Sequence, residues 1–305
     1  MKMSLVAPEL RSTLRRYPTV PVDRAWFRRL ARFGMRRLPT VDTPGVTVEA
    51  AGAIPGTRLY RPAARRSDDA LLWIHGGGLV LGGAVQDDRL CGSTARELGL
   101  IVLSVEYRLA PEHPYPAALD DCHAGWMWLQ ENAANLGVDP ARVVIGGQSA
   151  GGGLAAALVQ RLHDSVGTQP LAQWLFCPML DDRTAARSEL DAVKHRIWSN
   201  RANRYGWRVY LGAEPGVATL PSYAVPARRM DLSGLPPAWI GVGDIDLFHD
   251  EDRDYAQRMR DAGVATTFHV VPGAPHGFES WAPKTAISRG HVAAAQSWLR
   301  DVLAD

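Results

Sequence analysis

The segment that most constrains the fold of this chain is a run of β-branched residues that ends in glycines around one serine. Residues 143–145 form a buried-strand pattern, residues 146–153 are rich in glycine, and alanine and leucine follow. This order predicts a strand, a sharp turn and a helix. Gly147-x-Ser149-x-Gly151 has the spacing of a nucleophile elbow, in which a strained turn exposes the serine hydroxyl at the end of a sheet.

Two other interpretations of the same segment have to be weighed. The GxSxG spacing also occurs in plain strand-to-helix turns of glycine-rich chains. Gly151-x-Gly153-x-x-Ala156 matches the pattern of dinucleotide-binding loops. That pattern requires an acid at the end of the next strand, about 20 residues further on. The next apolar run, residues 171–177, ends in Cys-Pro-Met-Leu instead. The serine therefore needs partners elsewhere in the chain.

A serine nucleophile requires a base, and the base requires a third group that orients it. In enzymes with an elbow, the acid and then the histidine follow the serine in the chain, each after a strand. His276 lies in a proline-glycine loop directly after an apolar run, whereas His249 begins a predicted helix. We therefore expect His276 to be the base. The acid loop after the preceding apolar run offers four candidates: Asp244, Asp246, Asp250 and Glu251.

Acyl transfer also needs N–H donors directed at the developing oxyanion. In an elbow, one donor is the residue after the serine, here Ala150. Three glycines follow a buried strand and His75, which is more glycine than a plain turn needs. We assign the N–H groups of Gly77 and Gly78 as the other donors of the oxyanion hole, with His75 supporting the loop.

The rest of the chain alternates buried apolar runs with helical patterns. Helical patterns such as residues 88–98 and 117–132 separate apolar runs such as residues 70–75 and 100–107. This alternation predicts an α/β fold with a mostly parallel central sheet and helices on both faces. Two shorter alternating runs near residues 46–62 predict strands at a sheet edge.

One segment interrupts the alternation. Residues 181–226 carry aromatic side chains at helix-like intervals but show no strand pattern. We interpret this segment as an inserted helical cap, to which two short amphipathic helices within residues 1–45 contribute. The catalytic domain then comprises residues 46–180 and 227–305. The candidate walls of an apolar substrate pocket come from the glycine loop and the cap, although cap aromatics also serve packing: Leu79, Val80, Trp198, Trp207 and Tyr210.

Composition excludes several classes of function. A net charge of +2 over 305 residues gives no reason to expect binding to nucleic acid. Nine arginines crowd the first forty positions; we expect a solvated helix face, with attraction to anionic lipid or an acidic partner as the alternative. The chain shows neither a secretory signal nor a membrane-spanning run, so we expect a cytoplasmic protein without stable membrane insertion. Three scattered cysteines predict buried free thiols and no metal site.

Five ordered motifs together resemble those of the bacterial hormone-sensitive-lipase-like esterases of the α/β-hydrolase superfamily. In chain order they are residues 75–78, 107–114, the elbow at Ser149, residues 246–251 and residues 275–278. The resemblance covers residue 46 to the C-terminus and implies the α/β-hydrolase fold with a helical cap. In the family's D-L-F-x-D-E block the first aspartate is the acid, which maps onto Asp246. Dimers are frequent among such esterases, and a homodimer is expected on that ground alone.

The sequence departs from the family pattern at two positions. The elbow is commonly G-D-S-A-G or G-T-S-A-G, whereas this chain has Gln148 before the serine. An aromatic residue usually follows the triple glycine, where this chain has Leu79. Neither change removes a catalytic group, but both bear on the subfamily and on the shape of the pocket.

These residues lead to one hypothesis and three alternatives. The hypothesis is hydrolysis of small-molecule carboxylic esters with short to medium acyl chains, through a triad of Ser149, His276 and Asp246 and without a metal or organic cofactor. An amidase or acyl-peptide hydrolase would share the triad. A non-catalytic ligand receptor on this fold has lost the histidine, which is present here. A nucleotide-binding oxidoreductase remains as the interpretation of the glycines after the elbow.

Overall fold

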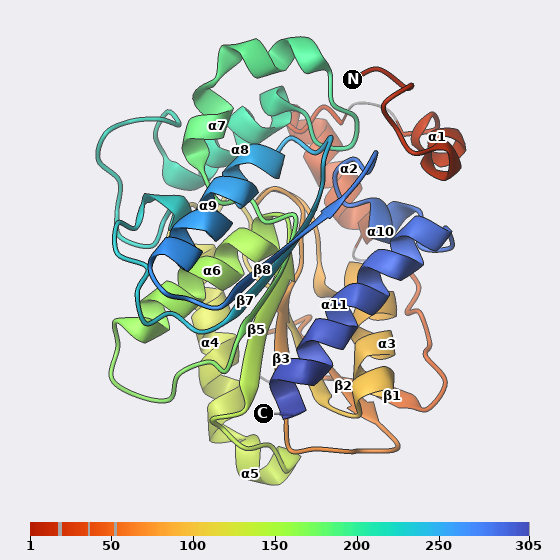
Figure 1. Ribbon diagram of the computed structural model, residues 1–305, viewed down its shortest axis with the longest axis vertical. Coiled ribbons are helices and arrows are strands. Elements are labelled where there is room, and N and C mark those ends of the chain that lie inside the picture. Colours follow the sequence, from red (N-terminus) through yellow and green to blue (C-terminus); the bar gives the residue numbers. More distant parts are fainter. Residues whose placement is uncertain (18–19, 36, 52–53, 305) are drawn as a thin grey trace.

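The computed structural model describes residues 1–17, 20–35, 37–51 and 54–304 and is built on a single eight-stranded sheet (Figure 1). The strands lie in the order β1-β2-β4-β3-β5-β6-β7-β8. β1 pairs antiparallel with β2, and β2 with β4, while all other neighbours are parallel. The predicted mostly parallel sheet is therefore confirmed, and the two short strands of residues 46–62 lie at its edge, where the structure pairs them antiparallel. The strand bounds are β1 Val46–Ala50, β2 Arg58–Pro62, β3 Ala70–Ile74, β4 Ile101–Val105, β5 Val143–Gln148, β6 Gln173–Phe176, β7 Ala238–Gly243 and β8 Thr266–Val271.

Helices cover both faces of the sheet, as Figure 1 shows. One face carries α3 (Asp88–Leu98) and α11 (Ala286–Ala304). The other carries α4 (Ala117–Glu131), α6 (Ala150–His163) and α9 (His249–Asp261). The short helices α5 (Ala133–Leu136) and α10 (Phe278–Trp281) lie in connections. Because both faces are covered, every residue of β3 to β7 is buried, which is why these strands are continuous apolar runs in the sequence.

Aromatic rings fill the layer between the sheet and the α3–α11 face. The ring of Phe176 in β6 lies 4.8 Å from both Trp174 and Trp239 and 5.7 Å from Trp73, measured between centroids. All four side chains are at most 1% exposed. Two of these contacts are edge-to-face and one is tilted. Aromatic contacts of this kind add to the stabilisation that burial gives, so Phe176 is the centre of this half of the core.

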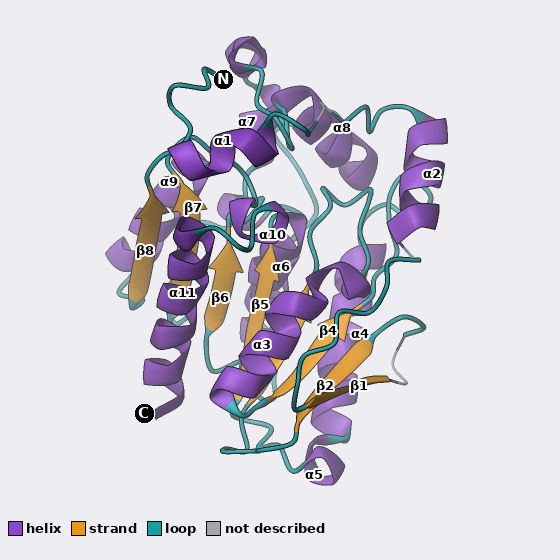
Figure 2. Cartoon of the chain, turned by 90° about the vertical axis from the view of Figure 1, so that its right-hand side faces the viewer, coloured by secondary structure: helices purple, strands orange, loops and turns teal. Residues whose placement is uncertain are grey.

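The segment after β6 lies over the carboxyl ends of the strands (Figure 2). Its helices are α7 (Asp182–Ala186) and α8 (Asn200–Leu211), with 3₁₀ turns at Ser188–Val193 and Pro226–Arg228, and it contains no strand in its fully described residues 181–226. Two N-terminal helices join it, α1 (Pro8–Leu14) and α2 (Ala25–Met35). Arg32 of α2 donates to the carbonyls of Val80, at 2.9 Å, and Ala110, at 2.6 Å. These bonds fasten α2 to the loops after β3 and β4.

The N-terminal arginines have different environments. Arg28 is buried and Arg32 is hydrogen-bonded, whereas Arg29 is exposed beside Trp26 and Leu30, each 64% exposed. Arg36 lies outside the described residues. An attraction of this helix face to lipid stays a prediction.

In the part of the chain that the structure describes, no helix is both long enough and apolar enough to cross a bilayer. The three cysteines are buried free thiols, as expected.

Removing the central ring should show how much the aromatic layer contributes. We expect Phe176→Ala to lower the free energy of unfolding by about 3–5 kcal/mol, because a buried aromatic is replaced by a cavity. The measurement is urea unfolding followed by circular dichroism. Met230→Ala is the control, since Met230 is 90% exposed, and its effect should stay within about 0.5 kcal/mol. Equal losses in the two variants would contradict this account of the core.

Candidate active site

Ser149 occupies the turn between β5 and α6 in a backbone conformation that is rare for a residue with a side chain. Its φ is 56° and its ψ is −121°. The turn is held on both sides, because the Ser149 N–H donates to the Phe176 carbonyl at 2.8 Å and the Ser149 carbonyl accepts from Met179 at 2.8 Å. A Cβ at Gly151 would lie 2.1 Å from the Ile74 carbonyl oxygen, so only glycine fits there. The GxSxG spacing thus reflects close packing of β5 and α6 against β3.

Ser149, His276 and Asp246 form a hydrogen-bonded chain. His276 follows β8, and its Nε2 lies 2.9 Å from Ser149 Oγ. Its Nδ1 lies 2.9 Å and 3.1 Å from the two carboxylate oxygens of Asp246, which follows β7. The Phe248 N–H donates to the same carboxylate at 3.0 Å. The carboxylate therefore holds the proton on Nδ1 and leaves Nε2 free to accept the serine proton.

The charge of Asp246 adjusts the basicity of His276. Burial is the largest single influence and lowers the pKa of this imidazole, but the charge and the hydrogen bond of the Asp246 carboxylate both raise it. Glu279 adds a smaller effect in the same direction. The pKa of His276 is consequently raised above its ordinary value.

The other three candidate acids serve different purposes. Asp244 accepts the Gly273 N–H at 2.6 Å, and Asp250 pairs with Arg253 at 3.1 Å on the surface. Glu251 is buried and accepts the N–H groups of residues 180 and 181, where the cap segment begins. Of these four described acids, Asp246 is the one that the structure brings to His276.

The loop of three glycines lies beside the serine. A Cβ at Gly76 would be 3.4 Å from the Cβ of Ser149. Gly77 and Gly78 have φ values of 126° and 61°, a region that favours glycine. Within the described residues, the N–H groups of Gly77, Gly78 and Ala150 have no hydrogen-bond acceptor in the chain. These three groups are thus unpaired donors around the end of β5, as an oxyanion hole requires.

The His75 side chain supports this loop through contacts with Tyr107 and Gly76. Its ring stacks on Tyr107 with the centroids 4.1 Å apart, and the Tyr107 hydroxyl donates to the His75 carbonyl at 2.9 Å. His75 Nδ1 lies 2.8 Å from the Gly76 carbonyl oxygen. Burial lowers the pKa of His75, which keeps the imidazole neutral.

The five candidate pocket residues are all buried and belong to the main hydrophobic core. Leu79 and Val80 follow the glycine loop, while Trp207 and Tyr210 lie on α8. Trp198 lies just before α8, and its ring covers the oxyanion loop: a Cβ at Gly78 would lie 1.9 Å from it. Ser149 is only 5% exposed. The cap therefore encloses the serine and its donors.

The sequence left Gln148 without a role, and the structure gives it partners. Its Nε2 donates to the carboxylate of Glu279 and to Ser280 Oγ, the latter at 2.7 Å. Both partners lie in α10, directly after His276. Glu279 is buried, and burial raises its pKa, against the opposing effect of its backbone and Gln148 hydrogen bonds. Gln148 thus joins the elbow to the histidine loop across 131 residues of sequence.

One set of side chains near the triad could in principle hold a metal ion. Cys177, Asp246 and His276 each place a potential ligand atom within 4.8 Å of the others. Burial raises the pKa of the Cys177 thiol well above its ordinary value, and a protonated thiol is a poor ligand. Both nitrogens of His276 are already engaged, by Ser149 and Asp246. The donor set therefore fits a hydrogen-bonded triad better than a metal centre.

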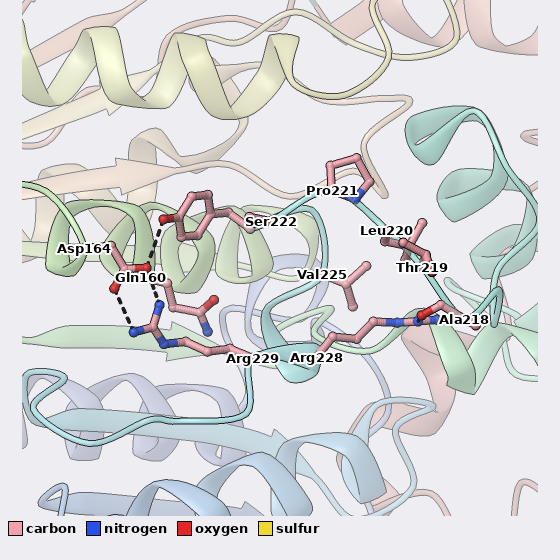
Figure 3. Close-up of a pocket in the computed structure, with 11 residues that line it drawn as sticks. Gln160, Asp164, Ala218, Thr219, Leu220, Pro221, Ser222, Val225, Arg228 and Arg229 are labelled. Carbon is pink, nitrogen blue, oxygen red and sulfur yellow. Dashed lines mark hydrogen bonds and ion pairs between the residues drawn. The ribbon is translucent and has the colours of Figure 1, made fainter.

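A cavity of about 380 Å³ lies away from this site, between the end of α6 and the second half of the cap segment (Figure 3). Asp164 lines this cavity and accepts hydrogen bonds from Arg229 at 2.6 Å and from Tyr223 Oη at 2.9 Å. None of its lining residues belongs to the triad or the glycine loop. We interpret these bonds as an anchor between the cap segment and α6.

Comparisons with known proteins agree with this geometry. Residues 71–280 match the family model of the alpha/beta hydrolase fold. The carboxylic ester hydrolase LipN of Mycobacterium tuberculosis is 37% identical over 78% of this chain, which spans 64% of the length of LipN. Carboxylesterase NlhH of the same species is 34% identical over 87% of this chain and 88% of its own length.

Comparison with solved structures also shows similarity to esterases. Esterase LipW from Mycobacterium marinum superposes with a TM-score of 0.89 at 35% identity, covering 99% of this chain and 98% of LipW. An esterase from the bacterial hormone-sensitive lipase family superposes with a TM-score of 0.79 at 28% identity, covering 97% and 99%. The likeness thus extends over nearly the whole of this chain.

Replacing Gln148 by glutamate tests the link between the elbow and the histidine loop. In this variant the carboxyl groups at positions 148 and 279 can stay in contact only by sharing a proton. The pair therefore has a raised pKa, and the stabilising contact is lost as the pH rises. We expect Gln148→Glu to lose about 1–3 kcal/mol more of the free energy of unfolding at pH 8 than at pH 5, relative to wild type. Urea unfolding at the two pH values measures this.

The matched control is Gln257→Glu. Gln257 is exposed on α9 and donates to Asp261 at 2.8 Å, so this variant also opposes two carboxylates, but in solvent. Its loss should be small at both pH values because water screens the charges. A pH-independent loss in Gln148→Glu would show that the two buried carboxyls do not interact.

Proposed function

Because the chain belongs to the α/β-hydrolase family, in its branch of hormone-sensitive-lipase-like esterases, we propose that it hydrolyses carboxylic esters with short to medium acyl chains through an acyl-enzyme. The observation that carries the proposal is the hydrogen-bonded chain from Ser149 Oγ through His276 to Asp246. The names of its relatives support ester hydrolysis. No feature of the site favours an amide substrate or a nucleotide cofactor over an ester.

In the proposed acylation step, Ser149 Oγ attacks the ester carbonyl carbon while His276 Nε2 takes its proton. Asp246 stabilises the imidazolium that forms and keeps it oriented. The tetrahedral intermediate then collapses, the alcohol leaves with the proton returned by His276, and the acyl group remains on Ser149. In the second half of the reaction, water attacks the acyl-enzyme with His276 again as base, which releases the acid and restores the serine.

The N–H groups of Gly77, Gly78 and Ala150 would receive the oxyanion in both halves. They are unpaired among the described residues, and the loop that carries two of them is held by stacking between His75 and Tyr107. Such preorganised donors contribute on the order of 3–4 kcal/mol each to the barrier reduction in related chemistry. The Trp198 ring against Gly78 limits the space above this loop, which supports short to medium rather than long acyl chains.

Loss of the nucleophile or the base should remove the activity. We expect Ser149→Ala and His276→Ala each to lower kcat on p-nitrophenyl butanoate by at least about a thousandfold. His249→Ala is the control for the histidine, because His249 begins α9 and contacts surface Asp250 at 3.2 Å. It should retain activity close to wild type. A Ser149→Ala enzyme with more than a tenth of the wild-type kcat would refute the proposed nucleophile.

The pH dependence should report the state of His276. The imidazole must be unprotonated to accept the serine proton, so kcat/KM should fall as the pH drops through its pKa. Since Asp246 raises that pKa above the ordinary 6.5, the acid limb should lie above pH 6.5. Asp246→Asn removes the charge that counteracts the effect of burial on the pKa of His276. This variant should therefore shift the acid limb to lower pH, besides slowing turnover. Asp244→Asn should leave the limb in place, and an identical shift in both variants would contradict the assignment.

A further inference from the structure

The inner face of α8 carries buried polar atoms that have no hydrogen-bond partner among the described residues. Asn203, Trp207 and Tyr210 are spaced at i, i+4 and i+7 and therefore project from the same face of the helix. Their side chains are 0%, 2% and 2% exposed. Both amide atoms of Asn203, Nε1 of Trp207 and Oη of Tyr210 are unpartnered, as is Nε1 of Trp198 just before the helix.

This clustering is unusual for a folded chain. Buried polar side chains are hydrogen-bonded in the large majority of cases, because an unpaired group keeps the cost of its desolvation. Four neighbouring side chains with unpaired atoms, gathered in one segment of the cap, therefore point to a partner outside the chain.

The same face of α8 touches the oxyanion loop. Gly206 lies on it, and a Cβ there would be 2.7 Å from the Gly78 carbonyl oxygen. The Trp198 ring packs on Gly78 from the same side. Figure 2 places α8 in the cap, at the end of the molecule where the parallel strands terminate. The unpaired atoms thus belong to the helix face that contacts the oxyanion loop.

We infer that the inner face of α8 is a hydrogen-bonding wall of the substrate site, so that the enzyme prefers esters with an ether, hydroxyl or carbonyl oxygen near the scissile carbonyl over plain alkyl esters. The two indole N–H groups and the Asn203 amide are donors, and the Tyr210 hydroxyl can donate as well, so the wall matches an oxygen acceptor. The inference rests on the proposed ester hydrolysis and changes the expected pocket from apolar to partly polar.

Tyr210 allows the hydroxyl to be separated from the rest of the side chain. The ring packs against Tyr115 with the centroids 5.7 Å apart, and the Tyr210 carbonyl accepts the Tyr115 N–H at 2.7 Å. Tyr210→Phe keeps both contacts and removes only the unpaired oxygen. Tyr205 lies on the same helix but is half-buried beneath Arg28, with the guanidinium carbon 5.0 Å from its ring. Tyr205→Phe is therefore a matched control.

The test compares two esters of equal length, p-nitrophenyl methoxyacetate and p-nitrophenyl butanoate, in which one oxygen replaces one methylene. The value of kcat/KM for each ester is divided by its rate of hydrolysis by hydroxide, which removes the difference in intrinsic reactivity. We expect the resulting ratio, ether over alkyl, to fall about tenfold in Tyr210→Phe or in Asn203→Leu, as for the loss of one buried hydrogen bond. The ratio should be unchanged in Tyr205→Phe.

Thermal stability supplies the second measurement. Each inner-face variant removes a polar group that is unpaired in the free enzyme, so its Tm should equal or exceed that of wild type. An unchanged ratio in both inner-face variants overturns the inference, and a lower Tm with an unchanged ratio does so too, because the polar atoms would then serve folding. If wild type hydrolyses neither ester, the proposed function itself fails, and that result is distinct from hydrolysis without an ether preference.

Discussion

The site depends on one strained turn that its surroundings enforce. Ser149 adopts a positive φ of 56° between β5 and α6, a conformation that costs free energy and persists only under close packing. Hydrogen bonds from the turn to Phe176 and Met179, together with the approach of Gly151 to β3, supply that packing. As a consequence, the Ser149 hydroxyl points from the end of the sheet toward His276, and the N–H of the next residue, Ala150, lies at the start of α6. The nucleophile and one oxyanion donor are thereby set by the same constraint.

The other parts of the site are brought to that turn by different strand ends. Asp246 follows β7, His276 follows β8, and the glycine loop follows β3, so their positions are fixed by the order of a parallel sheet. Gln148 adds a direct hydrogen-bonded link from the elbow to α10, the helix after His276. A neutral amide at this position lets the buried Glu279 accept a hydrogen bond. A carboxylate there would meet like charge.

Local patterns predicted most of this arrangement. The strand ends, the glycine spacing and the loop position of His276 are all features of short segments, and the structure brings Ser149, His276 and Asp246 together. The choice of Asp246 among four nearby acids required the family resemblance, because spacing alone does not say which carboxylate turns toward the histidine. The partnership of Gln148 with Glu279 joins residues 131 positions apart and has no local signal. The unpaired atoms of α8 likewise emerge only when burial and contacts are known.

The most direct test of the account is the structure of the enzyme after reaction with an alkyl phosphonate ester that mimics the tetrahedral intermediate. We expect a covalent bond between phosphorus and Ser149 Oγ, with the phosphoryl oxygen about 2.7–3.1 Å from the N–H groups of Gly77, Gly78 and Ala150. His276 Nε2 should remain within hydrogen-bond distance of the bonded oxygen. Phosphonylation of another residue, or a phosphoryl oxygen turned away from these three donors, would contradict it.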